Sequence, residues 1–132
     1  MQRLTDHLIV VSFDCLSAQD IRKLKELPNF KELLERAAIC DNVETIYPSV
    51  TYPSHASIVT GNYPNPHGVP TNTWLQPGRE SPDWYWARRY IQGTTLYDEA
   101  KKVDMTTAAL LWPVTAKAKI DYHMPEIFAN RP

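Results

Sequence analysis

Two side chains with the right chemistry for catalysis, Asp14 and Thr51, each follow a segment predicted to be a strand. A carboxylate at the end of a buried strand can bind a metal ion or act as a base, or it can simply cap a helix or face water. Thr51 lies at or just before a predicted helix start, where the helix dipole favours an alkoxide or a phosphate oxygen. Its hydroxyl becomes a good nucleophile only when a metal or a base activates it. The alternative is that Thr51 merely caps the helix.

The first third of the chain predicts two strands separated by two helices. Residues 7–13 form a largely apolar run of strand length, which is typical of a parallel strand that is buried on both faces. Ser17 and Asp20 match a capping box ahead of one helix, and Pro28 ends it and opens the next. Residues 39–46 alternate in polarity and predict the second strand.

The rest of the chain continues this alternation of helices and strands. A helix is predicted over residues 54–60, where Gly61 stops it, and another over residues 95–102. Between them, residues 63–82 are rich in proline and predict a long loop, while residues 106–112 predict a buried strand. Strands interleaved with helices at this spacing indicate a single α/β domain with a mainly parallel sheet flanked by helices.

Composition narrows the class of function. The chain has 132 residues, 14 Lys and Arg against 15 Asp and Glu, and a net charge of −1, so no basic field for a nucleic acid polymer or an anionic membrane is expected. No apolar stretch approaches the roughly 20 residues that a membrane span needs, and no signal peptide is recognised, so a cytoplasmic location is expected. Cys15 and Cys40 are predicted to be buried free thiols.

One long segment is the most specific motif of the chain, the block Tyr47-Pro-Ser-Val-Thr-Tyr-Pro-Ser-His-Ala-Ser-Ile-Val-Thr-Gly-Asn-Tyr-Pro-Asn-Pro-His-Gly68. Together with several other segments, it resembles the type I phosphodiesterase/nucleotide pyrophosphatase family of the alkaline phosphatase superfamily. The resemblance covers nearly the whole chain and implies an alkaline-phosphatase-like fold. It also includes the strand ending in Asp14 and residues 27–34, 71–74, 83–86 and 108–113.

This resemblance implies roles for four residues. Asp14 resembles the aspartate that binds one of two divalent metal ions, expected to be zinc, and Thr51 resembles the nucleophile that also touches that metal. Asn72, which lies 72 − 51 = 21 residues later, resembles the asparagine whose amide holds a phosphoryl oxygen. Tyr52 matches a position that stacks on a nucleobase, although a place in the core is the alternative. The implied reaction passes through a phospho-threonine that water hydrolyses.

The remaining polar residues are expected to have structural roles. The resemblance places His55 and His67 outside the metal site, with His55 facing inward to bond nearby backbone and His67 ordering the proline-rich loop. Asp121 and His123 fall in a segment that matches an ordinary loop of the family and are not expected to bind a catalytic metal. Residues 117–119 contain two lysines and are predicted to be a solvated surface.

Two departures from the family pattern stand out. Cys15 occupies a position where the family usually has glycine, so the turn after Asp14 must fit a side chain. Nothing after Pro113 resembles the family's remaining metal ligands, so residues 1–132 are expected to be the N-terminal part of a longer catalytic domain that is nearly inactive alone. The expected activity is hydrolysis of phosphodiester or pyrophosphate bonds in small-molecule, nucleotide-type phosphate esters. A phosphonate or phosphomonoester hydrolase and a non-catalytic nucleotide-binding module are the alternatives; the oligomeric state is left open.

Overall fold

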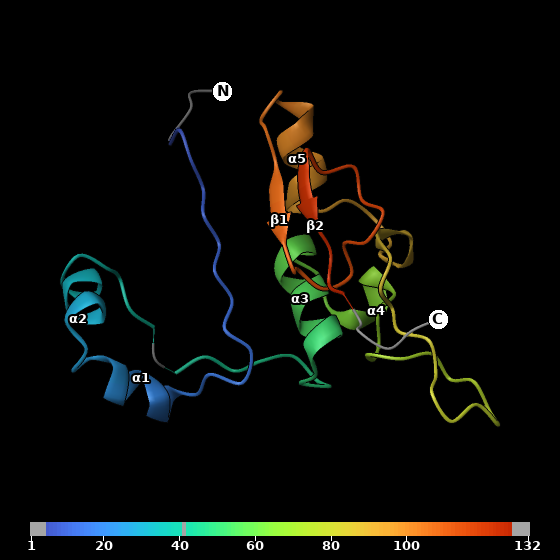
Figure 1. Cartoon of the computed structure of the whole chain (residues 1–132), viewed down its shortest axis with the longest axis horizontal. Helices are drawn as coiled ribbons and strands as arrows, with labels where there is room; N and C mark the ends of the chain where they lie inside the picture. Colours follow the sequence, from blue (N-terminus) through green and yellow to red (C-terminus); the bar gives the residue numbers. More distant parts are fainter. Residues whose placement is uncertain (1–4, 41, 128–132) are drawn as a thin grey trace. The chain divides into compact units, whose positions relative to one another are not determined.

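The computed structural model describes residues 5–40 and 42–127 (Figure 1). Its chain divides into two compact units, Met1–Glu44 and Thr45–Pro132, each of which is described by itself. Across the described residues, the helices are too short and too polar for any of them to cross a bilayer.

The first unit contains the two predicted helices, α1 (Ala18–Leu24) and α2 (Pro28–Glu35). The capping interaction predicted for α1 is present, because the Asp20 carboxylate accepts hydrogen bonds from the Ser17 N–H (2.9 Å) and the Ser17 hydroxyl (2.6 Å). Pro28 is the first residue of α2, where its missing N–H costs nothing. Local residues at the N-termini therefore determine where both helices begin.

The strands predicted over residues 7–13 and 39–46 are not found among the described residues, and these predictions were wrong. Residues 7–13 have no strand partner, and apolar side chains among them lie in solvent, with Ile9 83% exposed. Residues 39, 40 and 42–46 are not in a strand either, while residue 41 lies outside the described residues. A strand needs neighbouring strands that pair its backbone groups, and the described residues of this unit supply none.

The second unit begins with the helix predicted after the proline-rich junction. Helix α3 (Thr51–Thr60) starts at Thr51, earlier than the predicted Ser54, and ends at Gly61, whose φ of 65° closes the last turn with a hydrogen bond to the Ser57 carbonyl (2.8 Å). A short helix α4 (Pro64–His67) interrupts the predicted loop. A 3₁₀ turn, η1 (Arg88–Tyr90), and helix α5 (Leu96–Lys102) follow, and α3 contacts both α4 and α5.

A two-stranded parallel sheet completes this unit. Strand β1 (Ala108–Leu110) pairs with β2 (Tyr122–Met124), with Ala109 opposite His123 (Figure 1). The strand predicted over 106–112 is thus present but shorter, and β2 was missed because its segment has no apolar run. The described residues mix helices with a small parallel sheet, which is consistent with the predicted α/β class.

The core of the second unit forms around α3. Successive turns of this helix bury Tyr52, Ala56 and Val59, and the loop after β1 adds Trp112 and Val114. Each of these side chains is at most 8% exposed. Burying apolar surface of this kind stabilises a fold by roughly 25 cal/mol per Å². The helix that carries Thr51 is therefore anchored by its own buried face. The other buried members of the cluster are Val69, Ile91 and Ala109.

Candidate functional site

Thr51 is the first residue of α3, as its predicted role requires. Val50 before it is extended (φ −116°, ψ 160°), so the chain turns into the helix at Thr51. Pro53 in the first turn has no N–H to offer, and the Tyr52 N–H is already bonded to a side chain. Backbone donors at this N-terminus are therefore fewer than at an ordinary helix start, and further contacts to an anion must come from side chains.

Asn72 supplies such a side chain. Its Oδ1 accepts a hydrogen bond from the backbone N–H of Tyr52 at 2.9 Å, although 20 residues separate the two. An amide whose oxygen is engaged in this way turns its nitrogen, with two donor hydrogens, elsewhere. Among the described residues that nitrogen has no hydrogen-bond partner. The structure thus brings Asn72 to the start of α3, beside Thr51.

The backbone around Asn72 is fixed by the segment that follows the loop. The Asn72 backbone carbonyl accepts a hydrogen bond from the Tyr85 N–H (2.9 Å), and Thr73 forms an isolated antiparallel β-bridge with Trp84. Asp83 stabilises the loop between Thr73 and Trp84, because its carboxylate accepts a hydrogen bond from the Arg79 guanidinium (2.7 Å). Asn72 is therefore held through both its side chain and its main chain, which limits the positions that its amide can adopt.

Tyr52 lies in the core. Its side chain is 1% exposed, its ring packs against Trp84 with centroids 5.1 Å apart, and its hydroxyl donates to the carboxylate of Glu126. Trp86 adds a second bond to this segment, from its indole N–H to the Glu126 carbonyl (2.9 Å). The sequence offered no signal for Glu126. A stacking role for Tyr52 requires its ring to be uncovered, so that role stays a prediction.

The two histidines near α3 have the structural roles predicted for them. His55 is buried, and its Nδ1 donates to the Thr51 carbonyl (2.8 Å). His67 is fully buried, its Nδ1 accepts from the Val69 N–H (3.2 Å), and its Nε2 lies 3.0 Å from the Ser57 hydroxyl. Since Nδ1 accepts, Nε2 carries the proton and donates to Ser57, so His67 is no base for that hydroxyl. Burial lowers the pKa of His67, in keeping with a neutral ring.

Asp14 lies in the first unit and Thr51 in the second, so their predicted pairing stays a prediction. Cys15 has a φ of 60°, the left-handed region that glycine adopts most easily, which gives a physical reason for glycine at this turn. Both Cys15 and Cys40 are free but exposed, so their predicted burial was wrong. They fall in segments that were expected to pack as strands.

The side-chain types that most often hold metal ions are not clustered in the described part of the chain. Among the described residues, no group of three or more His, Cys, Asp or Glu side chains could hold a metal ion. The Asp121 carboxylate is instead bonded to Lys101 (2.6 Å) and to the Thr107 N–H (2.7 Å), and His123 Nε2 lies 3.1 Å from the Thr115 hydroxyl. A metal held by Asp14 and Thr51 would need further ligands that these residues do not supply.

Comparison with known proteins identifies the family of this chain. Residues 8–132 match the model of the family described as type I phosphodiesterase / nucleotide pyrophosphatase, so the chain belongs to that family. The resemblance based on the block around Thr51 is therefore confirmed.

Curated relatives cover most of this chain. It is 28% identical to the bis(5'-adenosyl)-triphosphatase enpp4 of Mus musculus over 82% of its length, and 27% identical to ectonucleotide pyrophosphatase/phosphodiesterase family member 1 of Homo sapiens over 77%. An uncharacterized pyrophosphatase/phosphodiesterase of Schizosaccharomyces pombe is 29% identical over 80%. The chain spans 25%, 12% and 23% of these relatives, respectively, or a quarter of their length at most.

Proposed function

We propose that this chain carries the nucleophile and a phosphate-binding side chain of a hydrolase that cleaves phosphodiester or pyrophosphate bonds in nucleotide-type, small-molecule substrates. The observation that carries the proposal is the bond from the Tyr52 N–H to Asn72, which sets an amide beside Thr51 at the start of α3. Membership of the family, and relatives named as a triphosphatase and as pyrophosphatase/phosphodiesterases, support it.

In the proposed reaction the Thr51 hydroxyl oxygen attacks phosphorus. As the bond from Thr51 to phosphorus forms, the hydroxyl loses its proton to water and the bond from phosphorus to the leaving oxygen breaks, so the leaving group departs and takes up a proton from water. A water molecule then attacks the phosphorus of the phospho-threonine, the bond from phosphorus to Thr51 breaks, and Thr51 regains its proton. The amide nitrogen of Asn72 donates to a non-bridging oxygen, where charge develops in the transition state. The Tyr52 N–H and the Tyr85 N–H keep that amide in place.

Other parts of the proposal rest on sequence resemblance. Asp14 is the group proposed to help activate Thr51, as ligand to one of two divalent ions, with zinc the expected metal. The described residues do not form a metal site, so no step is assigned to a metal here. The alkaline-phosphatase-like fold, the cytoplasmic location and the near inactivity of the 132-residue chain alone belong to the same proposal.

Turnover of an aryl phosphodiester, measured on this chain and on any longer product of its gene, tests the proposal. We expect Thr51→Ala to abolish turnover wherever it occurs and Thr51→Ser to retain part of it, because serine keeps a hydroxyl. Mass spectrometry after an acid quench should find on Thr51 a phosphoryl group that still carries the second ester group of the diester, and metal analysis should find zinc in the active form. Robust turnover by Thr51→Ala would overturn the proposal.

The same assay separates the related functions. Faster turnover of a phosphomonoester or of phosphonoacetate than of the diester would change the substrate class while keeping Thr51 as nucleophile. A protein that binds nucleotide without metal, and equally well as Thr51→Ala, would be a binding module instead. Rates on a diester, a monoester and a phosphonoacetate, together with nucleotide affinity, distinguish these results.

A further inference from the structure

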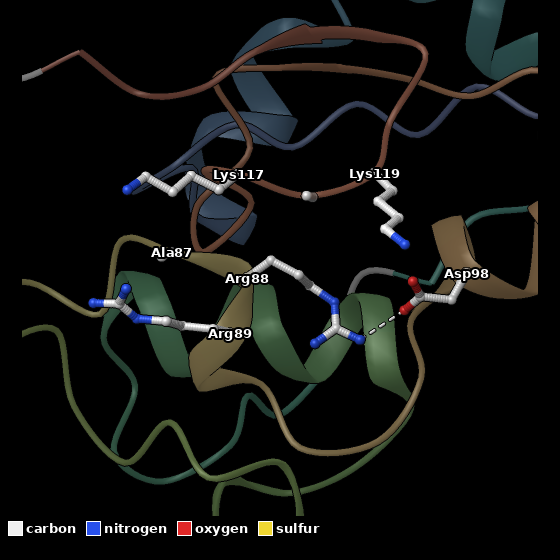
Figure 2. Close-up of a pocket in the computed structure, with 7 residues that line it drawn as sticks. Ala87, Arg88, Arg89, Asp98, Lys117 and Lys119 are labelled. Atoms are coloured by element: carbon white, nitrogen blue, oxygen red, sulfur yellow. Dashed lines mark hydrogen bonds and ion pairs between the residues drawn. The ribbon is translucent and has the colours of Figure 1, made fainter.

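Four cationic side chains surround a pocket of about 400 Å³ in the second unit (Figure 2). Lys117 and Lys119 come from the loop between β1 and β2, and Arg88 and Arg89 from η1. Asp98 of α5 is the one carboxylate among the lining residues, so the formal charge is 4 − 1 = +3. We call these five side chains the basic pocket. Both lysines are exposed, as predicted, but they belong to a cluster that the sequence did not reveal.

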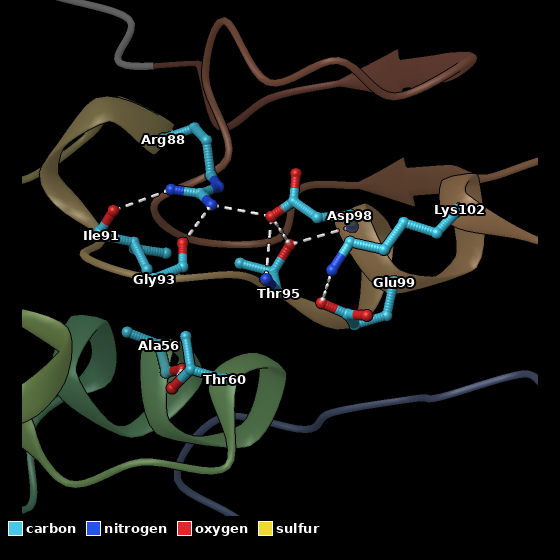
Figure 3. Close-up of polar contacts among 9 residues, drawn as sticks. All are labelled: Ala56, Thr60, Arg88, Ile91, Gly93, Thr95, Asp98, Glu99 and Lys102. Atoms are coloured by element: carbon cyan, nitrogen blue, oxygen red, sulfur yellow. Dashed lines mark hydrogen bonds and ion pairs between the residues drawn. The ribbon is translucent and has the colours of Figure 1, made fainter.

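The carboxylate of the basic pocket already has hydrogen-bond partners within the protein. Asp98 Oδ2 accepts from Arg88 Nη2 (2.7 Å), from the Thr95 N–H (2.8 Å) and from the Thr95 hydroxyl (2.8 Å), as Figure 3 shows. Burial raises the pKa of Asp98, but the hydrogen bonds from Arg88 and Thr95 outweigh it and leave the pKa below its usual value. Asp98 therefore stays charged and neutralises Arg88.

The other three cations have no such partner. Within the described residues, neither Lys117 nor Lys119 forms an ion pair. The Arg89 guanidinium lies 4.9 Å from the centroid of the Tyr90 ring and donates to the Tyr90 hydroxyl (2.9 Å), and it has no ion pair with another described residue. These three positive charges repel one another, and an anion among them would remove that repulsion.

Backbone hydrogen bonds hold these cations on the same side of the molecule. The Arg88 N–H donates to the Ala116 carbonyl (2.9 Å), and the Ala116 N–H donates to the Trp86 carbonyl (3.2 Å). Ala116 itself is 1% exposed, so the loop that carries both lysines is fixed to the segment that carries the arginines. The positive charges are therefore close together before a ligand binds, which reduces the entropic cost of binding.

We propose that the basic pocket binds an oligophosphate anion, either inorganic pyrophosphate or the phosphate chain of a nucleotide. Three cations without carboxylate partners suit an anion of several charges, and Lys and Arg are the residues that bind phosphate oxygens best. The pocket volume admits a diphosphate. None of the five side chains is Thr51 or Asn72, so the proposal does not depend on the proposed function.

Titration of the full chain with inorganic pyrophosphate tests this site. Nuclear magnetic resonance should show the backbone amides of residues 117–119 and of η1 shifting together, and calorimetry gives the affinity. Lys117→Gln with Lys119→Gln should weaken binding by about tenfold or more, because each lysine is a direct charge contact to phosphate. The matched control, Lys25→Gln with Lys31→Gln, removes the same net charge from exposed positions of the first unit and should change affinity little.

The ligand series identifies the source of the phosphate. Equal affinity for pyrophosphate and adenosine diphosphate would mean that the phosphate chain alone is recognised, and tighter binding of adenosine diphosphate would point to a nucleotide; both support the proposal. Equal pyrophosphate affinity in the two double variants would overturn it. Amide shifts confined to the neighbourhood of Thr51 and Asn72 would also overturn it, and this measurement on the unmodified chain needs no variant to fold.

Discussion

The side-chain oxygen of Asn72 lies 2.9 Å from the backbone nitrogen of Tyr52, the residue that follows Thr51. This single hydrogen bond joins two segments that sequence resemblance alone had placed in one site. It also separates two functions of the same amide, because the oxygen stabilises the fold and the nitrogen is available to a substrate.

Replacing Asn72 with aspartate should separate these functions. A carboxylate oxygen still accepts the Tyr52 N–H bond, so Asn72→Asp should unfold in urea with nearly the wild-type free energy at pH 7. The donor nitrogen, however, becomes a negatively charged oxygen that repels phosphate, so we expect the affinity for orthovanadate or phosphate at this site to fall by about tenfold or more. Urea denaturation and calorimetry measure the two effects.

Asn72→Ala is the companion variant. It removes both groups, so it should lose phosphate affinity and about 1 kcal/mol or more of stability, since the Tyr52 N–H loses its partner. If Asn72→Asp bound phosphate as well as the wild type, the amide nitrogen would have no role in holding a phosphoryl oxygen.

Removing the Ser57 hydroxyl should lower the free energy of unfolding and leave phosphate binding unchanged. Ser57 and the fully buried His67 ring form a hydrogen bond of 3.0 Å, so Ser57→Ala removes one partner of that ring, at a cost of about 1 kcal/mol. Phosphate binding should not change, because Ser57 is an acceptor in this pair and not an activated nucleophile. Ser54→Ala on the same helix is the control, since among the described residues the Ser54 hydroxyl has no hydrogen-bond partner.

Helices α1, α2, α3 and α5 were predictable because their signals are local, whereas the short α4 lies in a segment predicted to be a loop. The Ser17 and Asp20 pair, Pro28 at a first helical turn and Gly61 after the last one each act within a few residues, and each is found where the sequence indicated. The start of α3 was less predictable: the helix was predicted to begin at Ser54, whereas it begins at Thr51, directly after the extended Val50.

The strands were less predictable because a strand is defined by its partners. Residues 7–13 have the composition of a buried strand but are exposed, whereas β2 (Tyr122–Met124), with no apolar run, pairs with β1. For the site, resemblance identified Thr51 and Asn72, but the partner of the Tyr52 hydroxyl, Glu126, lies 74 residues away and only the fold reveals it.

Replacing Arg88 with lysine should destabilise the second unit although the charge is kept. Arg88 donates to three acceptors at once: the carbonyls of Ile91 (2.8 Å) and Gly93 (2.7 Å) and the carboxylate of Asp98 (2.7 Å) (Figure 3). A lysine ammonium lacks the planar fork that reaches all three, so we expect a loss of about 1–3 kcal/mol in urea denaturation. Arg89→Lys, at the exposed neighbouring position, should cost much less, and equal losses would contradict this account.

Acid should weaken the junction between α5 and the sheet as Asp121 takes up a proton. Hydrogen bonds from the Lys101 ammonium (2.6 Å) and from Thr107 lower the pKa of Asp121 to about 2, from an ordinary value of 3.8. Because the folded pKa is the lower one, this stabilisation is present above about pH 4 and is lost as the pH falls towards 2. Asp121→Asn should therefore lose less stability than the wild type between pH 5 and pH 2.5. Lys101→Met should raise the pKa of Asp121, so that the loss of stability ends at a higher pH than in the wild type. Nuclear magnetic resonance of the Asp121 carboxyl group measures this pKa directly. An unchanged pKa in Lys101→Met would rule out the ion pair as the cause of the lowered value.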